Sequence, residues 1–157
     1  MTAPGSQNNS DLFDGFRNGS LHIHLVSQPD YFFNEETQDA RYIELDFHAG
    51  DWEALFFNAL HCPARDEYET GEDITEYHER NRRKFAQSIP TNPMLGRIFD
   101  MYEDYLYTLD EVPRLRVECL KVMATVRDSE ALKALRKLVF ACDQASSGGF
   151  HLAFTCD

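Results

Sequence analysis

The sequence lacks the long apolar runs and the signature motifs that would assign it to a familiar functional class. None of its 157 residues belong to an apolar stretch of the roughly 20 residues that a transmembrane helix needs. Its first residues, MTAPGSQNNSD, have neither the basic nor the apolar region of a signal peptide. The GxSxG, Walker, GxGxxG and HExxH motifs are also absent. We therefore expect a cytoplasmic protein that is not bound to a membrane, is not an enzyme and uses no cofactor.

Cysteines are few and are not arranged as pairs. Cys62, Cys119, Cys142 and Cys156 form no CxxC motif and are widely spread along the chain. This pattern favours buried, reduced thiols, with a disulfide as the less favoured alternative. Cys62 follows His61, but adjacent residues on a helix point to different sides, so the two are not expected to form a catalytic dyad.

Basic residues are scarce. The chain has 15 lysines and arginines against 27 acidic residues, which gives a formal net charge of −12. Residues 1–113 carry a net charge of −14 and residues 114–157 a net charge of +2. This imbalance argues against nucleic acid as the direct ligand and favours a basic protein partner.

Acidic residues concentrate in two segments that contain no lysine or arginine. Residues 66–79 hold seven acidic residues and residues 100–111 hold five. Tyrosines are interleaved with both runs, and tyrosine is enriched in protein interfaces because it offers a large rigid surface with a polar tip. A solvated face that only keeps the protein soluble is the alternative interpretation. The expected partner-binding residues are Asp66, Glu67, Glu69, Glu72, Asp73, Asp100, Glu103, Asp104, Tyr107, Asp110 and Glu111.

The two segments are expected to differ in local structure. The first precedes a helix, in a loop that contains Gly71. Four members of the second have helical spacing and are expected to share one exposed face of a helix that begins at Asn92. They are Asp100, Glu103, Asp104 and Tyr107. A block of basic residues at 80–84 is expected to neutralise the acidic run before it, with a phosphate site as the alternative.

Three segments alternate apolar and polar residues with the period of a β-strand: 20–26, 41–48 and 150–156. We expect them to form one antiparallel sheet with one apolar face. The expected buried residues are Leu21, Ile23, Leu25, Ile43, Leu45, Phe47, Leu152 and Phe154. The opposite, solvent-facing side would carry His22 and His24, paired with Glu44 and Asp46. A metal site that combines this histidine pair with His48 and His151 is the alternative, but no spacing places a third ligand, so no metal is expected.

Helical periodicity occupies most of the chain between the second and third strands. Helices are expected over 51–61, 73–88, from Asn92 through Tyr107, over 113–126 and from a cap at 128–129 through Cys142. Lys133, Arg136 and Lys137 are expected on the outer face of the last one. Residues 1–10 are expected to be disordered, and 29–36 to form a turn with a short strand at 31–33. The sequence thus predicts a single α+β domain over 11–157, a small antiparallel sheet covered on one face by about five helices.

Residues 92–118 carry a family resemblance. The stretch NPMLGRIFDMYED runs into YTLDEV at 107–112 and then Leu115 and Glu118. It resembles a pattern in small acidic immunity proteins that bacteria encode beside polymorphic or contact-dependent toxins. The resemblance implies a non-catalytic protein that binds and neutralises a basic toxin, and it transfers no individual binding residue. The alternatives are a regulatory or adaptor protein for another basic protein, a histidine-based metal-binding protein, and an unrecognised enzyme.

Overall fold

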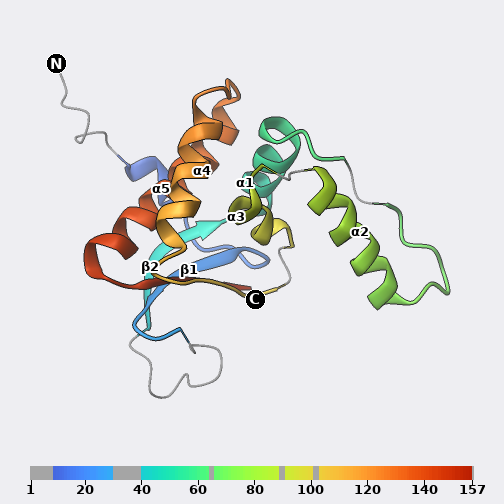
Figure 1. Cartoon of the computed structure of the whole chain (residues 1–157), viewed down its shortest axis with the longest axis horizontal. Helices are drawn as coiled ribbons and strands as arrows, with labels where there is room; N and C mark the ends of the chain where they lie inside the picture. Colours follow the sequence, from blue (N-terminus) through green and yellow to red (C-terminus); the bar gives the residue numbers. More distant parts are fainter. Residues whose placement is uncertain (1–8, 30–39, 64–65, 89–90, 101–102, 157) are drawn as a thin grey trace.

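The computed structural model describes residues 9–29, 40–63, 66–88, 91–100 and 103–156. Four strands form one antiparallel sheet in the order β2-β1-β4-β3 (Figure 1). They are β1 (Leu21–Val26), β2 (Ala40–Phe47), β3 (Tyr105–Tyr107) and β4 (His151–Cys156). The three strands predicted from the sequence are β1, β2 and β4, and the predicted α+β class is confirmed. β3 was not predicted.

Among the described residues, five α-helices accompany the sheet, and all but α2 lie on one of its faces (Figure 1). The five are α1 (Ala49–Glu53), α2 (Ile74–Ser88), α3 (Pro93–Gly96), α4 (Val112–Met123) and α5 (Ser129–Gly148). A π-helical segment, η4 (Ala54–Ala59), continues α1, and a 3-10 turn, η5 (Arg97–Phe99), continues α3. The fifth helix, α2, projects away from the sheet. No helix within the described residues is long and apolar enough to cross a bilayer.

The longest helix, α5, begins at the predicted cap and extends six residues beyond Cys142, to Gly148. Its N-cap is Asp128, whose side chain accepts a hydrogen bond from the Ala131 N–H at 2.9 Å. This bond satisfies one of the free N–H groups of the first turn. At the other end Gly149 has a φ of 70°, a left-handed conformation that glycine adopts without the steric cost of a Cβ. The chain then enters β4, which lies beside β1.

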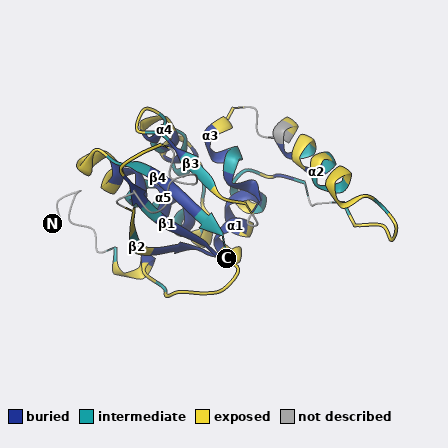
Figure 2. Ribbon diagram, turned by 90° about the horizontal axis from the view of Figure 1, so that it is seen from below, coloured by how far each residue is buried: buried dark blue, intermediate teal, exposed yellow. Residues whose placement is uncertain are grey.

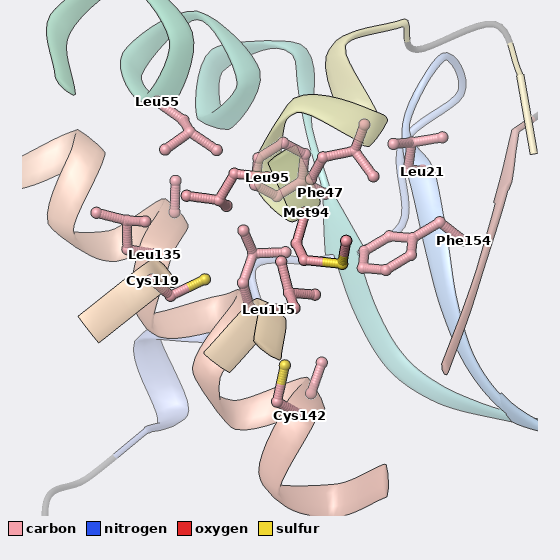
Figure 3. Packing of buried hydrophobic residues seen from close by; sticks show 14 of the residues in the cluster. Leu21, Phe47, Leu55, Met94, Leu95, Leu115, Cys119, Leu135, Cys142 and Phe154 are labelled. Atoms are coloured by element: carbon pink, nitrogen blue, oxygen red, sulfur yellow. The ribbon is translucent and has the colours of Figure 1, made fainter. Parts of the chain in front are cut away.

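The hydrophobic core lies between the sheet and the covering helices (Figure 3). Leu21, Phe47 and Phe154 from the sheet face Leu115 of α4 and Leu135 of α5 across this layer. Seven of the eight strand residues predicted to be buried are buried. The exception is Ile43, which is partly exposed. It lies where the pairing of β2 with β1 shifts register, next to Glu44 with a positive φ of 58°.

The helix predicted to run from Asn92 through Tyr107 is wrong. The structure has one short helix, α3, then the turn η5, and then the strand β3, which pairs with the free edge of β4. Asp100 already has extended backbone angles, φ −109° and ψ 114°. The apolar residues of this segment fit both helical and strand spacing, and the backbone hydrogen bonds offered by β4 decide between them. Asp100, Glu103, Asp104 and Tyr107 therefore do not share a helix face.

The expectations for the chain's start and for the first long loop fall largely outside the described residues. Residues 1–8 and 30–39 are not described, so the disorder predicted for 1–10 and the turn and strand predicted for 29–36 stay predictions. The described chain begins with a 3-10 turn, η1 (Ser10–Leu12), whose Leu12 is buried in the core.

Candidate functional site

The first predicted acidic segment forms a projecting arm. We call residues 66–80, which comprise the loop before α2 and the first half of that helix, the acidic arm. Figures 1 and 2 show it extending away from the sheet and its covering helices. The other end of α2 is anchored, because Phe85 is buried against Trp52, Phe56 and Phe99. The arm therefore presents its side chains from a helix whose base is held in the core.

Two acidic residues of the arm hold its loop onto α2. Asp66 accepts hydrogen bonds from Arg80 at 3.1 Å and from Lys84 at 2.7 Å, and Glu72 pairs with Arg80. Hydrogen bonds from these two cations lower the pKa of the Asp66 carboxyl, and the bond from Arg80 lowers that of Glu72. The Tyr68 hydroxyl donates to the Glu72 carbonyl at 2.6 Å. The prediction that basic residues after the segment neutralise part of it is confirmed.

The remaining carboxylates of the arm face solvent. Glu67, Glu69, Asp73, Glu76 and Glu79 are exposed, and no ion pair among the described residues involves them. Asp73 also caps α2, because it accepts hydrogen bonds from two N–H groups of the first turn at 2.8 and 3.2 Å. The arm thus keeps a dense negative charge with which no cation of the described residues pairs.

Two large apolar side chains lie exposed among these carboxylates. Ile74 is 52% exposed and Tyr68 is 48% exposed. The Tyr68 ring packs edge-on against Tyr77 at 5.3 Å between centroids, so its position is set by the arm itself. The arm thus offers a pre-positioned aromatic and an aliphatic side chain that exposed carboxylates flank in the sequence, and protein-binding surfaces combine apolar and charged groups of this kind.

The second predicted segment is used mainly within the fold. Asp100 is buried, and its backbone exchanges hydrogen bonds with the Tyr105 hydroxyl. Glu103 pairs with Arg82 of α2 at 2.6 Å, and Asp104 accepts a hydrogen bond from the Cys156 N–H at 2.8 Å. Glu103 and Asp104 are exposed at the surface, but each of them already makes one of these contacts within the fold.

Of the three other predicted residues in that segment, two make contacts within the fold and one is exposed. Tyr107 is fully buried, and its hydroxyl donates to the Met94 carbonyl at 2.6 Å. Glu111 pairs with Arg97, and this pairing lowers the pKa of Glu111 to about 2. Asp110 alone is exposed and makes no ion pair within the described residues. The prediction of Tyr107 as an exposed interface residue is wrong, because its ring fills the space between β3 and α3.

The residues that carry the family resemblance hold this part of the fold together. Glu118 of α4 accepts hydrogen bonds from the Met94 and Leu95 N–H groups at 3.0 Å each, which caps the N-terminus of α3. Arg97 also lies over the Tyr107 ring, 5.2 Å from its centroid. The residues that carry the resemblance therefore make contacts that hold α3, β3 and α4 together.

The strand histidines take up polar contacts of their own. His22 Nδ1 lies 2.9 Å from Asp46 Oδ1, as the cross-strand pairing predicted, and Tyr42 donates to the same oxygen at 2.6 Å. His22 is buried, however, and the ring of Phe16 from the N-terminal segment stacks on it at 4.5 Å. The prediction that this histidine faces solvent is wrong for that reason. His24 is half-buried near Thr155, and burial lowers its pKa.

Sequence reasoning missed a buried ionic cluster around Lys137. This lysine was expected on the outer face of α5, but it is 0% exposed. Its ammonium lies 3.0 Å from both oxygens of Asp14, 2.6 Å from Asp51 and 2.9 Å from the carbonyl of Asp46. A signal existed: the buried Ala134 and Ala141 lie three residues before and four residues after it, so helical spacing places Lys137 on their face.

The cluster joins the N-terminal segment to the rest of the fold. Asp14 also accepts a hydrogen bond from His48 Nε2 at 2.9 Å and contacts Lys133 at 3.0 Å. Burial raises the pKa of Asp14, but the bonds from the two lysines outweigh burial and lower it to about 2. The Asp14 carboxylate is thus held ionised among these cations. Arg136, the other residue expected on the outer face, pairs with Asp11 at 2.8 Å.

The cluster has the connectivity of two known kinds of functional site. Ser20 Oγ lies 2.7 Å from His48 Nδ1, which continues to Asp14 like a serine–histidine–aspartate relay. Ser20 is only 2% exposed, so a substrate cannot reach its hydroxyl in this fold. Asp14, His48 and Asp51 also offer three possible metal ligands within 4.8 Å of one another. The Lys137 ammonium already supplies a cation to both carboxylates, so the cluster is best explained as a structural one.

The cysteines carry no reactive thiol in this environment. All four are free, and all but Cys156 are buried. Burial raises the pKa of Cys62 to about 11 and of Cys142 to about 12, and it raises the pKa of Cys119 well above its usual value. These thiols stay protonated at neutral pH and are poor nucleophiles.

Comparison with protein-family models, with curated proteins and with solved structures finds no match to this chain. The acidic arm is the part of the predicted site that the fold leaves available to a partner.

Proposed function

We propose that this protein is a non-catalytic binding protein that recognises a basic partner protein through the acidic arm. The observation that carries the proposal is the exposure of Tyr68 and Ile74, which are flanked in the sequence by exposed carboxylates that form no ion pair among the described residues. We further propose that the partner is a toxin in the cytoplasm and that binding neutralises it. The resemblance of residues 92–118 to immunity proteins supports this form of the function.

Charge and shape support the arm as the docking element. The net charge of −12 attracts a basic partner over a distance set by ionic strength, and a projecting element can enter a concave basic cleft. Apolar contact by Tyr68 and Ile74 would slow dissociation, while the carboxylates around them would accelerate association. Substitutions of Tyr68 or Ile74 are therefore expected to change mainly the dissociation rate, and substitutions of the carboxylates mainly the association rate.

The test is to co-express the product of the neighbouring gene with this protein and to measure binding kinetics and protection from toxicity. Reversing charge with Glu67→Lys and Glu69→Lys together should lower the association rate by about tenfold at low salt and by less at high salt. Tyr68→Ala should mainly raise the dissociation rate, with a loss of about 2 kcal/mol in binding free energy if it is a central contact.

Two matched variants complete the design. Glu53→Lys reverses an exposed charge on α1, outside the arm, and should leave the affinity within about threefold of wild type. Asp110→Lys tests the exposed residue of the second predicted segment in the same way. Wild-type affinity in all arm variants would rule out the arm. Binding to a basic protein without protection from any toxin would favour the adaptor interpretation.

A further inference from the structure

The outward side of α4 carries apolar side chains that no described element covers. Val117 is 63% exposed and Leu120 is 41% exposed, and Pro113 and Ala124 are exposed as well. Separations of three, four and seven residues place these four on one side of a helix. We call them the α4 stripe. It follows the helix for about 17 Å, at about 1.5 Å per residue.

Two cations border the α4 stripe on one side. Arg114 and Lys121 are exposed and lie seven residues apart, so they share an edge of the helix. Neither makes an ion pair within the described residues. Glu118, the acidic residue nearest them on the helix, is engaged in capping α3. This side of α4 therefore combines apolar and positively charged groups on a chain that is strongly acidic as a whole.

The acidic arm is a complementary surface on the same chain. It offers the exposed Tyr68 and Ile74 and five exposed carboxylates that form no ion pair among the described residues. The arm does not lie against α4 of its own chain, because α3 lies between α2 and α4 and the arm extends away from both (Figures 1 and 2). A contact between the two surfaces therefore requires two molecules.

We propose that the acidic arm docks on the α4 stripe of a second copy of this chain. The carboxylates of the arm pair with the two cations of α4, and the exposed apolar side chains of the arm lie against the α4 stripe. When each copy docks its arm on the other, the contact forms twice and closes a two-fold dimer. The dimer keeps the arm covered until a basic protein competes for it. This inference rests on the proposed function in treating the arm as the docking element, but it needs no other protein.

The net charge sets the affinity to expect. Each copy carries −12, so two copies repel each other at long range. At physiological ionic strength charges are screened beyond about 8 Å, which leaves the opposite charges in direct contact as the stronger effect. Each contact is small, and we expect a dissociation constant of roughly 0.1 mM. Sedimentation equilibrium of the full chain from about 10 μM to about 1 mM covers this range.

Two charge-reversal variants test the contact from its two sides. The arm variant carries Glu67→Lys and Glu69→Lys, and the α4 variant carries Arg114→Glu and Lys121→Glu. Each variant alone should raise the dissociation constant by at least about tenfold, because like charges then face each other. An equimolar mixture of the two should dimerise with an affinity within about threefold of wild type, since every arm then meets an α4 stripe of opposite charge.

Matched controls separate this contact from general charge effects. Glu53→Lys and Arg17→Glu reverse exposed charges outside both surfaces and should change the dissociation constant by less than about threefold. The arm variant is less negative than wild type and the α4 variant is more negative, so general repulsion alone would strengthen association of the first. Val117→Ser should weaken association by about fivefold. Its melting temperature should stay that of wild type, because the side chain is exposed.

The outcomes distinguish this inference from the proposed function. A wild-type chain that stays monomeric at about 1 mM overturns the inference and leaves the α4 stripe to a different acidic protein. A mixture of the two variants that does not dimerise, with both folds intact by circular dichroism, overturns it as well. The proposed function fails separately, if a basic partner binds the arm variant as tightly as wild type.

Discussion

The acidic arm and the segment at 100–111 are both rich in acidic residues and tyrosine, and they use those residues differently. In the arm, Asp66 and Glu72 tie the loop to α2, and five further carboxylates face solvent. In the second segment, Asp110 is the only acidic residue without a described contact, and Tyr107 is fully buried. Similar composition therefore leads to a docking surface in one case and to a structural element in the other.

The difference comes from what each segment lies against. Residues 105–107 pair with the edge strand β4, so their side chains enter the core and their neighbours contact the surrounding elements. Among the described residues the arm pairs with no strand. The helix that carries it is held in the core by Phe85, which lies beyond the arm. An acidic residue becomes structural where the fold brings a cation or an N–H group from another element to it, and it stays available where none arrives.

The largest expected effect on stability concerns Asp14 and Asp51, the acidic residues that contact the buried ammonium of Lys137. Lys137→Met keeps most of the side-chain volume but leaves two carboxylates beside a buried position without an ammonium. We expect the free energy of unfolding in urea to fall by about 3–5 kcal/mol. Lys133→Met is the control, since Lys133 is partly exposed and should cost less than about 1 kcal/mol. Equal losses in both variants would contradict the special role of the buried lysine.

A second prediction compares the tyrosines of the two segments. Tyr107→Ala should destabilise the protein by about 3–5 kcal/mol, because it leaves a cavity beside Phe154 and removes the hydrogen bond to Met94. Tyr68→Ala should change stability by no more than about 0.5 kcal/mol, because the side chain is half exposed. Thermal or chemical unfolding of both variants measures the difference. A large loss in Tyr68→Ala would show that the arm is structural as well.

The third prediction concerns acid pH. The folded-state pKa of Glu111 is about 2, below its ordinary value of 4.5, so its contribution to stability is complete above about pH 5 and is lost as the pH falls through 2. A shift of this size corresponds to about 3.4 kcal/mol, which partial exposure of the ion pair to solvent reduces to about 2–3 kcal/mol. Glu111→Gln should flatten the decline in unfolding free energy between pH 5 and 2 by about that amount, measured by urea titrations at several pH values. Glu69→Gln is the matched control, because it removes an exposed carboxylate that forms no ion pair among the described residues.

The smallest expected effect is at the ion pair that joins the two regions. Arg82 of α2 contacts Glu103 at 2.6 Å, with about half of each side chain exposed. A double-mutant cycle with Arg82→Gln and Glu103→Gln should give a coupling energy below about 1 kcal/mol that decreases further in high salt. A coupling of several kcal/mol would mean that α2 depends on this contact for its position.

Much of the fold could be predicted because it depends on local patterns. The strands β1, β2 and β4 follow from alternation, the start of α5 from the cap at Asp128, and the loop-to-helix layout of the arm from its composition. The histidine pairing of His22 with Asp46 also follows from strand register. Each of these features depends on residues close in sequence or on one repeated period.

Other features required the tertiary structure. The strand β3 exists because β4 presents an open edge, and Tyr105–Tyr107 alone do not specify strand over helix. Which acidic residues remain available depends on cations that approach from far along the chain, such as Lys137, 123 residues after Asp14. By itself the sequence determined the α+β class, the three long strands and the strong negative charge, because periodicity and composition are local properties. Only the folded chain decided which of those charges are neutralised inside it and which face a partner, because that depends on distances between residues that the sequence places far apart.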